Sequence, residues 1–327
     1  MSTHRERMEA CIAGRNTDRP PVALWRHFPV DDQQPEKLAA ATLQWQKTYD
    51  WDIVKVTPAS SFCIRDWGVE DEWKGDSEGT RRYTKRAVFA LEDWAQLSVL
   101  DVDSPQLAAQ LKCLSLLRNE LGPDVPLIQT VFSPLAQAKN LVGGTDLLAH
   151  MRMRPEWVGR GLEIILESTR RFVRAARAAG LIDGIFYAVQ HAQASLLTKD
   201  EFIEFGRSYD LQVLESARML WLNILHAHGE NLYFNNVADY PVQMINWHDR
   251  DTPPSLSEAL PRTRAALCGG LRRETMVYGT AEDVEAEAID AFDQTRGGQR
   301  LMLATGCVVP IIAPHGNLMA ARMSVEK

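Results

Sequence analysis

Eight short apolar runs recur along the chain, and longer amphipathic segments lie between them. The runs cover residues 22–25, 52–56, 126–131, 183–188, 222–226, 243–247, 265–268 and 300–304. Nearly continuous apolar strands are typical of a parallel sheet that is covered by helices on both faces. The pattern therefore predicts parallel strands that alternate with helices.

The amphipathic segments with the clearest helix signals are 36–49, 155–179, 198–218 and 284–294. Thr198 is followed three residues later by Glu201, which predicts a capping box, and Thr280-Ala281-Glu282-Asp283 repeats this pattern. Eight strands separated by helices in a chain of 327 residues favour a (β/α)8 TIM barrel over an open sheet. We expect residues 1–327 to form this barrel as a single domain.

The segment 63–102 departs from the alternation of strands and helices. It is rich in charged residues and tryptophan, and it contains RRYTKRAVFAL, in which polar and apolar residues alternate. Alternation of this kind is typical of strands. We therefore expect a β-hairpin-like insertion after the second strand.

The composition argues against several classes of protein. The net charge is −7, whereas a nucleic-acid-binding surface needs a basic face. No segment approaches the roughly 20 apolar residues of a membrane helix, and the N-terminal segment lacks the apolar region of a secretory signal. The five cysteines are scattered and do not resemble a disulfide framework. We expect a cytoplasmic protein that binds neither nucleic acid nor membranes.

Polar side chains concentrate just after the predicted strands. Six of the eight histidines lie there, namely His27, His191, His226, His228, His248 and His315. The other polar residues at such positions include Arg26, Tyr187, Gln190, Gln193, Asp249 and Cys307. In a TIM barrel the active site is built at the carboxyl ends of the strands. These residues are therefore expected at one mouth of the barrel.

The stretch ILHAHGEN places two histidines where an apolar run ends. Residues i and i+2 of an extended segment point to the same side, so His226 and His228 can face one point. Together with Cys307 after the last strand, they make a ligand set that suits zinc and leaves the fourth position open. A structural interpretation stays open here, in which the histidines are hydrogen-bonded and Cys307 is a small buried residue.

Segments spread over most of the chain resemble the uroporphyrinogen decarboxylase superfamily. RERMEACIAGRNTDRPPVALW resembles its opening helix and first strand, and SLLTKDEFIEFGRSYD resembles the segment after its fourth strand. GTAEDVEAEAIDAF and GGQRLMLATGCVVPIIAPHGNL resemble its closing helix, strand and loop. The resemblance implies a single-domain barrel, in agreement with the strand pattern.

True uroporphyrinogen decarboxylases need no metal, and their motifs are incomplete in this chain. LWRHFPVDD keeps one arginine of the expected pair, Arg26, and KVTPASSF has no Asp after the second strand. FSPLAQAKN lacks the expected tyrosine, and ATGC replaces an LGHG-like stretch. These four departures disfavour a standard decarboxylase.

A second branch of the superfamily consists of zinc-dependent methyltransferases, which move a methyl group between a corrinoid protein and a thiol such as coenzyme M. Their signature resembles HxCG after the fifth strand and GC after the eighth, where this chain has LHAHGEN and ATGCVVP. His226 matches the His, His228 stands at the first Cys, and Cys307 matches the last Cys. The resemblance thus implies Zn²⁺ held by His226, His228 and Cys307.

The same resemblance implies roles for the remaining polar residues at the barrel mouth. The expected catalytic residues are Arg26, His191 and His248, and the expected substrate-binding residues are His27, Tyr187, Gln190, Gln193 and Asp249. The alternative for each of these residues is a solvated loop position or a structural hydrogen bond, and this alternative is favoured for Tyr187 and Gln190.

The expected function is zinc-dependent methyl transfer between a methylated small molecule or thiol and a corrinoid cofactor or corrinoid protein. One alternative is a decarboxylase that acts on a porphyrinogen, and another is a non-catalytic barrel that binds a ligand or corrinoid. The resemblance also implies a homodimer.

Overall fold

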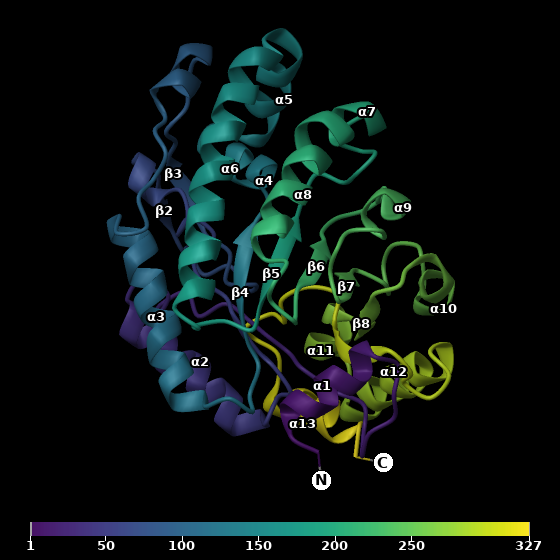
Figure 1. The fold of residues 1–327 in the computed structure, drawn as a ribbon. Coiled ribbons are helices and arrows are strands. Elements are labelled where there is room, and N and C mark those ends of the chain that lie inside the picture. Colours follow the sequence, from purple (N-terminus) through teal and green to yellow (C-terminus); the bar gives the residue numbers. More distant parts are fainter. Residues whose placement is uncertain (1, 327) are drawn as a thin grey trace.

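Seven parallel strands form one curled sheet in the computed structural model, which describes residues 2–326 (Figure 1). In sheet order they are β1 (Val54–Val56), β4 (Leu127–Phe132), β5 (Gly184–Val189), β6 (Ile224–Ala227), β7 (Met244–Trp247), β8 (Ala266–Leu271) and β9 (Leu301–Thr305). Every residue of these strands is buried, as a parallel sheet covered on both faces requires. The predicted alternation of parallel strands and helices is confirmed.

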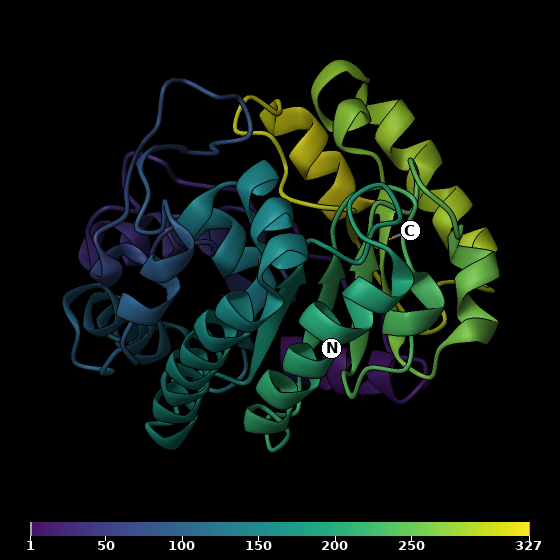
Figure 2. The same ribbon diagram turned by 90° about the horizontal axis from the view of Figure 1, so that it is seen from above.

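Helices surround the sheet, as the view from above shows (Figure 2). They are α1 (His4–Ile12), α2 (Pro35–Tyr49), α3 (Pro105–Leu121), α4 (Pro134–Val142), α5 (Gly144–Met153), α6 (Pro155–Ala178), α7 (Lys199–Phe202), α8 (Ser208–Ser216), α9 (Phe234–Val237), α10 (Leu256–Ala259), α11 (Arg273–Tyr278), α12 (Ala281–Gln294) and α13 (His315–Met323). Thr198 and Thr280 form the predicted capping boxes at the starts of α7 and α12. None of the helices in residues 2–326 is both long and apolar enough to cross a membrane.

The strand predicted at residues 22–25 is wrong as a regular strand. Within the described chain, Val22 is the one residue of this segment that forms a β-bridge, and its partner is Leu303 of β9. The Val22 N–H donates to the Asp52 carboxylate at 2.8 Å, and the Val22 carbonyl accepts the Asp52 N–H at 2.9 Å. On the β9 side, the Ala23 N–H donates to the Leu303 carbonyl at 3.0 Å and the Leu303 N–H donates to the Pro21 carbonyl at 2.9 Å. On the β1 side a carboxylate takes the Val22 N–H, so the backbone ladder is interrupted there. The fold is TIM-barrel-like, with seven regular strands instead of the predicted eight.

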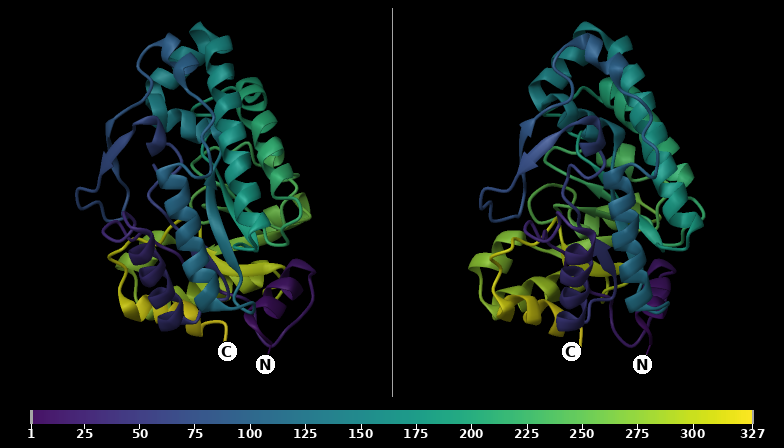
Figure 3. Two further views of the ribbon diagram at one scale, coloured as in Figure 1. Left: turned by 60° about the vertical axis from the view of Figure 1, so that its left-hand side comes forward. Right: turned by 90° about the vertical axis from the view of Figure 1, so that its left-hand side faces the viewer.

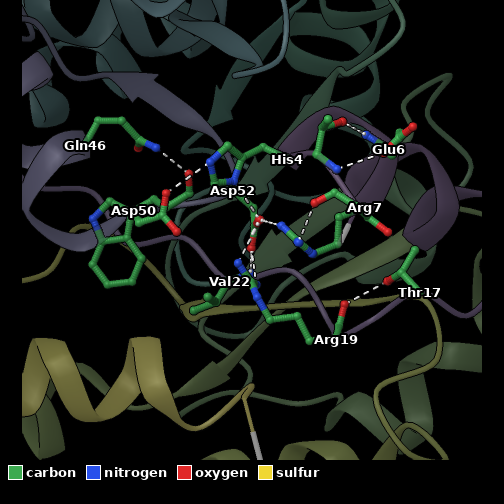
Figure 4. A network of polar contacts seen from close by, with 12 residues as sticks. His4, Glu6, Arg7, Thr17, Arg19, Val22, Gln46, Asp50 and Asp52 are labelled. Carbon is green, nitrogen blue, oxygen red and sulfur yellow. Dashed lines mark hydrogen bonds and ion pairs between the residues drawn. The ribbon is translucent and has the colours of Figure 1, made fainter.

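Asp52 links this segment to α1 at the amino-terminal end of the sheet (Figure 4). Its carboxylate is fully buried and contacts Arg7 and Arg19 at 2.6 Å each and His4 at 3.0 Å. A buried carboxylate is tolerated when cations and hydrogen-bond donors surround it, as they do here. Asp52 therefore holds Val22 beside the start of β1 through side-chain contacts.

The insertion after β1 lies beside the carboxyl ends of the strands, at the edge of the molecule (Figure 3). It contains β2 (Glu70–Glu72) and β3 (Arg82–Lys85), which pair antiparallel, and two 3-10 turns at Arg65–Trp67 and Leu91–Gln96. The predicted hairpin-like insertion is confirmed in part, since the paired strands are short.

The loop between β2 and β3 packs onto the mouth of the sheet. Glu78 in this loop forms an ion pair with Arg273 at the start of α11. Gly79 has φ +81°, and a Cβ at this position would lie 2.5 Å from the Cβ of His27. Only glycine allows this approach, because any side chain would be both strained and overlapped. The loop thereby forms a wall above the candidate site.

Candidate metal centre

Four side chains with metal-binding atoms converge at the carboxyl ends of three strands. His226 lies in β6 and His228 follows that strand, His248 follows β7, and Cys307 follows β9. Their ligand atoms all lie within 4.8 Å of one another. The structure therefore brings together the three predicted metal ligands and adds His248, which was expected to be catalytic.

The distances between these atoms fit a tetrahedral metal site. His228 Nδ1 lies 3.4 Å from His226 Nε2 and 3.4 Å from His248 Nε2. Cys307 Sγ lies 3.6 Å from His226 Nε2 and 3.8 Å from His228 Nδ1. The ligand atoms of tetrahedral zinc, with bonds of about 2.0–2.3 Å, are separated by about 3.3–3.8 Å. Imidazole and thiolate are also the donors that zinc prefers, so the site fits this metal.

The histidines favour the thiolate form of Cys307. Burial by itself raises the pKa of this thiol, but the neighbouring imidazoles of His226, His228 and His248 outweigh burial and hold the pKa well below its usual range. The thiolate is the form of cysteine that binds metals. Burial instead raises the pKa of each of the other four cysteines. Among the five cysteines, Cys307 therefore has the surroundings of a ligand.

Asn246 of β7 fixes the orientation of the His226 ring. Its side-chain amide donates to the carbonyls of Cys268 at 2.8 Å and Thr305 at 3.1 Å. Its Oδ1 therefore faces His226 Nδ1 at 2.6 Å and accepts a hydrogen bond from this nitrogen. With the proton on Nδ1, the lone pair of His226 Nε2 is free for a metal. Metal-bound histidines commonly donate their other ring N–H to an acceptor of this kind.

Replacing Asn246 with alanine is expected to lower the affinity for zinc by about 10- to 100-fold, because the His226 ring loses the acceptor that fixes its tautomer. Competition with a chelating dye measures the change. Asn235→Ala, at an exposed position in α9, is the matched control and should leave the affinity unchanged. Equal zinc affinities of the wild type and Asn246→Ala would contradict the orienting role.

A cavity of about 280 Å³ adjoins the metal-binding group on the side of β1, β4 and β5. His226, His228 and Cys307 form one end of it, and its wall includes His27 and Gln190, two of the predicted substrate-binding residues. Residues of the β2–β3 loop also border this space. A small molecule in the cavity would therefore reach the metal-binding group.

Comparison with known proteins identifies the family. The family model described as uroporphyrinogen decarboxylase (URO-D) matches residues 3–327. The chain belongs to the URO-D family. This match confirms the family resemblance seen in the sequence motifs.

The curated relatives of this URO-D protein include proteins named methylcobamide:CoM methyltransferases. It is 25% identical over 217 residues to the methylcobamide:CoM methyltransferase MtaA of Methanosarcina barkeri, a match that covers 66% of this chain and 62% of the relative. It is 22% identical over 247 residues to the methylcobamide:CoM methyltransferase MtbA of Methanosarcina mazei, over 75% of this chain and 70% of the relative. The match to MtaA thus spans less than two thirds of that protein. The predicted closeness to the methyltransferase branch is confirmed.

Solved structures share the fold. A methyltransferase from Methanosarcina mazei superposes with a TM-score of 0.86 at 20% identity and covers 99% of this chain and 98% of its own. A B12-independent methionine synthase from Shewanella sp. W3-18-1 gives a TM-score of 0.56 at 16% identity, over 94% of this chain and 92% of its own. At these identities the likeness establishes the fold alone.

Two residues predicted to act at the URO-D site, Arg26 and Gln193, do not border the cavity. The Arg26 guanidinium donates to the Ile311 carbonyl at 3.3 Å and lies 4.7 Å from the centre of the Trp45 ring. The Gln193 side chain donates to the Gln190 carbonyl at 2.7 Å and accepts from a backbone N–H of the following loop at 3.1 Å. Both side chains connect loops at the strand ends.

His191 and Asp249 also lie outside the cavity wall. His191 is buried, and burial lowers its pKa to about 3, so this imidazole is neutral. The Asp249 carboxylate is buried and accepts the Gly270 N–H at 3.1 Å. The structure thus gives Asp249 a structural hydrogen bond and gives His191 no contact with the metal-binding group.

Tyr187 has the structural role that was its alternative. Its side chain is fully buried, and its hydroxyl donates to Asp210 at 2.7 Å. Tyr240 donates to the other oxygen of Asp210 at the same distance. Burial raises the pKa of Asp210 to about 7, although both tyrosine hydrogen bonds lower it.

This raised pKa predicts a pH-dependent stability. Asp210 is protonated in the folded state up to pH about 7, whereas in the unfolded chain its pKa is about 3.9. The stabilising contribution of the protonated group is therefore complete below pH 4 and is lost as the pH rises to about 7. Relative to Asp210→Asn, the wild type should lose on the order of 4 kcal/mol across this window. Urea unfolding of both proteins from pH 4 to 8 measures the difference, and parallel curves would refute it.

Two lysines that line the cavity were missed by the sequence analysis. Lys55 lies in β1 and Lys139 in α4, and both border the same space as His226. The signal for Lys55 was present, since a cation in the middle of the apolar run 52–56 is unusual for a strand buried on both faces. Lys139 carries no comparable signal, because lysine is common in helices.

Proposed function

We propose that this URO-D family protein is a zinc-dependent methyltransferase that moves a methyl group between a small molecule or thiol and a corrinoid cofactor or corrinoid protein. The observation that carries the proposal is the convergence of His226, His228 and Cys307 beside a cavity of about 280 Å³. Support comes from relatives that are named methylcobamide:CoM methyltransferases. Residues 1–327 form a single (β/α)8-type domain in this proposal, with Val22 in place of the eighth strand.

His226, His228 and Cys307 are the residues that would hold the zinc ion. When bound, zinc supplies Lewis-acid activation, which lowers the pKa of a substrate heteroatom and favours its anionic form at neutral pH. His248 lies outside the HxH and GC pattern, so we assign it a catalytic role next to these ligands. A catalytic zinc site has three protein ligands and one open position, in agreement with this division.

His228 stands where the methyltransferase signature has cysteine. An imidazole is a harder and less electron-donating ligand than a thiolate, so the site favours a substrate other than the usual thiol. The decarboxylase alternative is weaker, because Arg26 is the one expected motif residue that the chain keeps, and it lies outside the cavity. We also propose a cytoplasmic homodimer that acts with a small-molecule substrate and a corrinoid partner.

Metal analysis and a methyl-transfer assay test the function together. The purified protein should contain about one zinc ion per chain, and it should demethylate methylcobalamin in the presence of a suitable acceptor, as followed by the cobalamin absorption spectrum. Acceptors should include thiols as well as alcohols and amines. A metal-free protein that transfers no methyl group, or one that releases carbon dioxide from uroporphyrinogen, would overturn the proposal.

A further inference from the structure

Lys55 lies inside the cavity without a carboxylate partner. Its side chain is 7% exposed, and its ammonium donates to Thr57 Oγ1 at 3.2 Å. The same ammonium lies 4.5 Å from the centre of the Phe186 ring and 5.6 Å from that of Trp25. A hydroxyl and two aromatic faces solvate a cation only weakly compared with water.

Lys139 is the second lysine of the cavity without a carboxylate partner. Its ammonium donates to Gln190 Oε1 at 2.7 Å, and in residues 2–326 no carboxylate forms an ion pair with either lysine. Burial lowers the pKa of Lys55 to about 7, although the charge of Cys307 raises it, and burial together with the charge of Arg86 lowers the pKa of Lys139 to about 8.

Most of the remaining charges that border the cavity are paired within the protein. The exception is the Cys307 thiolate, which is the negative charge that acts on Lys55 and which a bound metal would neutralise. Arg81 contacts Asp71 at 2.7 Å and Asp32 at 3.3 Å, and Glu78 pairs with Arg273. With a metal bound to Cys307, the two lysines are therefore the charges that a ligand would meet. Such an excess of positive charge in an enclosed space attracts an anion.

Phe186 connects the lysine end of the cavity to the metal-binding end. The His226 imidazole stacks on the Phe186 ring with centroids 5.3 Å apart and an interplanar angle of 25°. Lys55 lies over the same ring. A small ligand along this ring can thus contact the lysine and approach His226 at the same time.

We propose that the cavity binds a small organic anion, whose carboxylate-type group is attracted by the ammonium groups of Lys55 and Lys139 while its body lies against Trp25 and Phe186. The volume of about 280 Å³ suits a molecule of the size of benzoate. The inference rests on the proposed function in one respect: it assumes that the anionic substrate reacts at the end of the cavity formed by His226 and Cys307.

Isothermal titration with benzoate and with benzamide, its uncharged isostere, tests the anion site on the zinc-loaded full chain. The wild type should bind benzoate at least about tenfold more tightly, because a charge-assisted hydrogen bond is the main difference between the probes. Lys55→Met and Lys139→Met should each reduce this preference by about tenfold or remove it. Lys55→Arg retains the charge and should retain a preference for benzoate.

Lys112→Met is the matched control, because Lys112 is an exposed lysine on α3 that pairs with Glu36. It should leave both affinities unchanged. Equal binding of benzoate and benzamide by the wild type, or an unchanged preference in Lys139→Met and Lys55→Met, would overturn the proposal. The titration needs no turnover, so the absence of methyl transfer would overturn the proposed function and leave this result intact.

Discussion

Cys307→Ala should abolish stoichiometric zinc binding and lower methyl transfer by about a thousandfold. The substitution removes the thiolate, which is the one anionic ligand of the proposed three, and leaves only His226 and His228. A bound metal contributes several kcal/mol of charge stabilisation to a reaction, and each 1.36 kcal/mol corresponds to a factor of ten in rate. Zinc content by elemental analysis and the methylcobalamin assay measure the two effects.

Cys63→Ala is the matched control for this experiment. Cys63 is also partly exposed, but burial of its thiol raises its pKa to about 12, so it stays protonated. The control should keep both zinc and activity. If Cys307→Ala retained a full equivalent of zinc, the ligand role of Cys307 would be wrong, and His226, His228 and His248 would have to bind the metal alone.

The metal-binding group could be predicted from the sequence because two general rules of strand geometry and topology apply to it. The two-residue repeat of an extended chain places His226 and His228 on one side, and the barrel topology brings the ends of β6 and β9 to the same mouth. Neither rule depends on the detailed packing of side chains. Their combination was sufficient to predict that Cys307 lies near the histidines.

Within a strand the same repeat decides which side chains face the site. Tyr187 lies in β5 between Phe186 and Ala188, which line the cavity, so its side chain faces the other side and contacts Asp210 on α8. The direction of a side chain beyond the strand end follows no such rule. Arg26 extends towards Ile311 in a later loop. These contacts join segments that are far apart in sequence, so a local pattern carries no information about them. The cavity residue Lys55 was overlooked for a related reason. An apolar run predicts that a segment is buried, but it does not predict which side chains surround a lysine within that segment.

The missing eighth strand has the same origin. The apolar run 22–25 satisfies the local criterion for a strand, yet the Val22 N–H is taken by the carboxylate of Asp52. Hydrophobic periodicity detects burial, and Val22 is indeed fully buried. Hydrophobic periodicity cannot detect that a buried carboxylate will accept the N–H that a backbone carbonyl of the next strand would otherwise accept.

Asp52→Asn should therefore lower the free energy of unfolding by about 3–5 kcal/mol, the usual cost of breaking a buried ion pair on one side. The substitution leaves the Arg7 and Arg19 guanidinium groups without their shared anion (Figure 4), and it weakens the contact that holds Val22. Urea unfolding followed by circular dichroism measures the loss.

Asp50→Asn separates burial from the simple loss of a carboxylate. Asp50 contacts His4 at 3.1 Å and Arg322 at 2.9 Å, but its side chain is 61% exposed. Exposed ion pairs contribute at most about 1 kcal/mol, because water solvates the separated charges. The two variants make the same chemical change next to the same histidine, His4. An equal loss of unfolding free energy in both would show that the stabilisation by Asp52 does not come from its burial. A loss confined to Asp52→Asn would show that the buried carboxylate, which contacts Arg7, Arg19 and Val22, is the one that stabilises the fold.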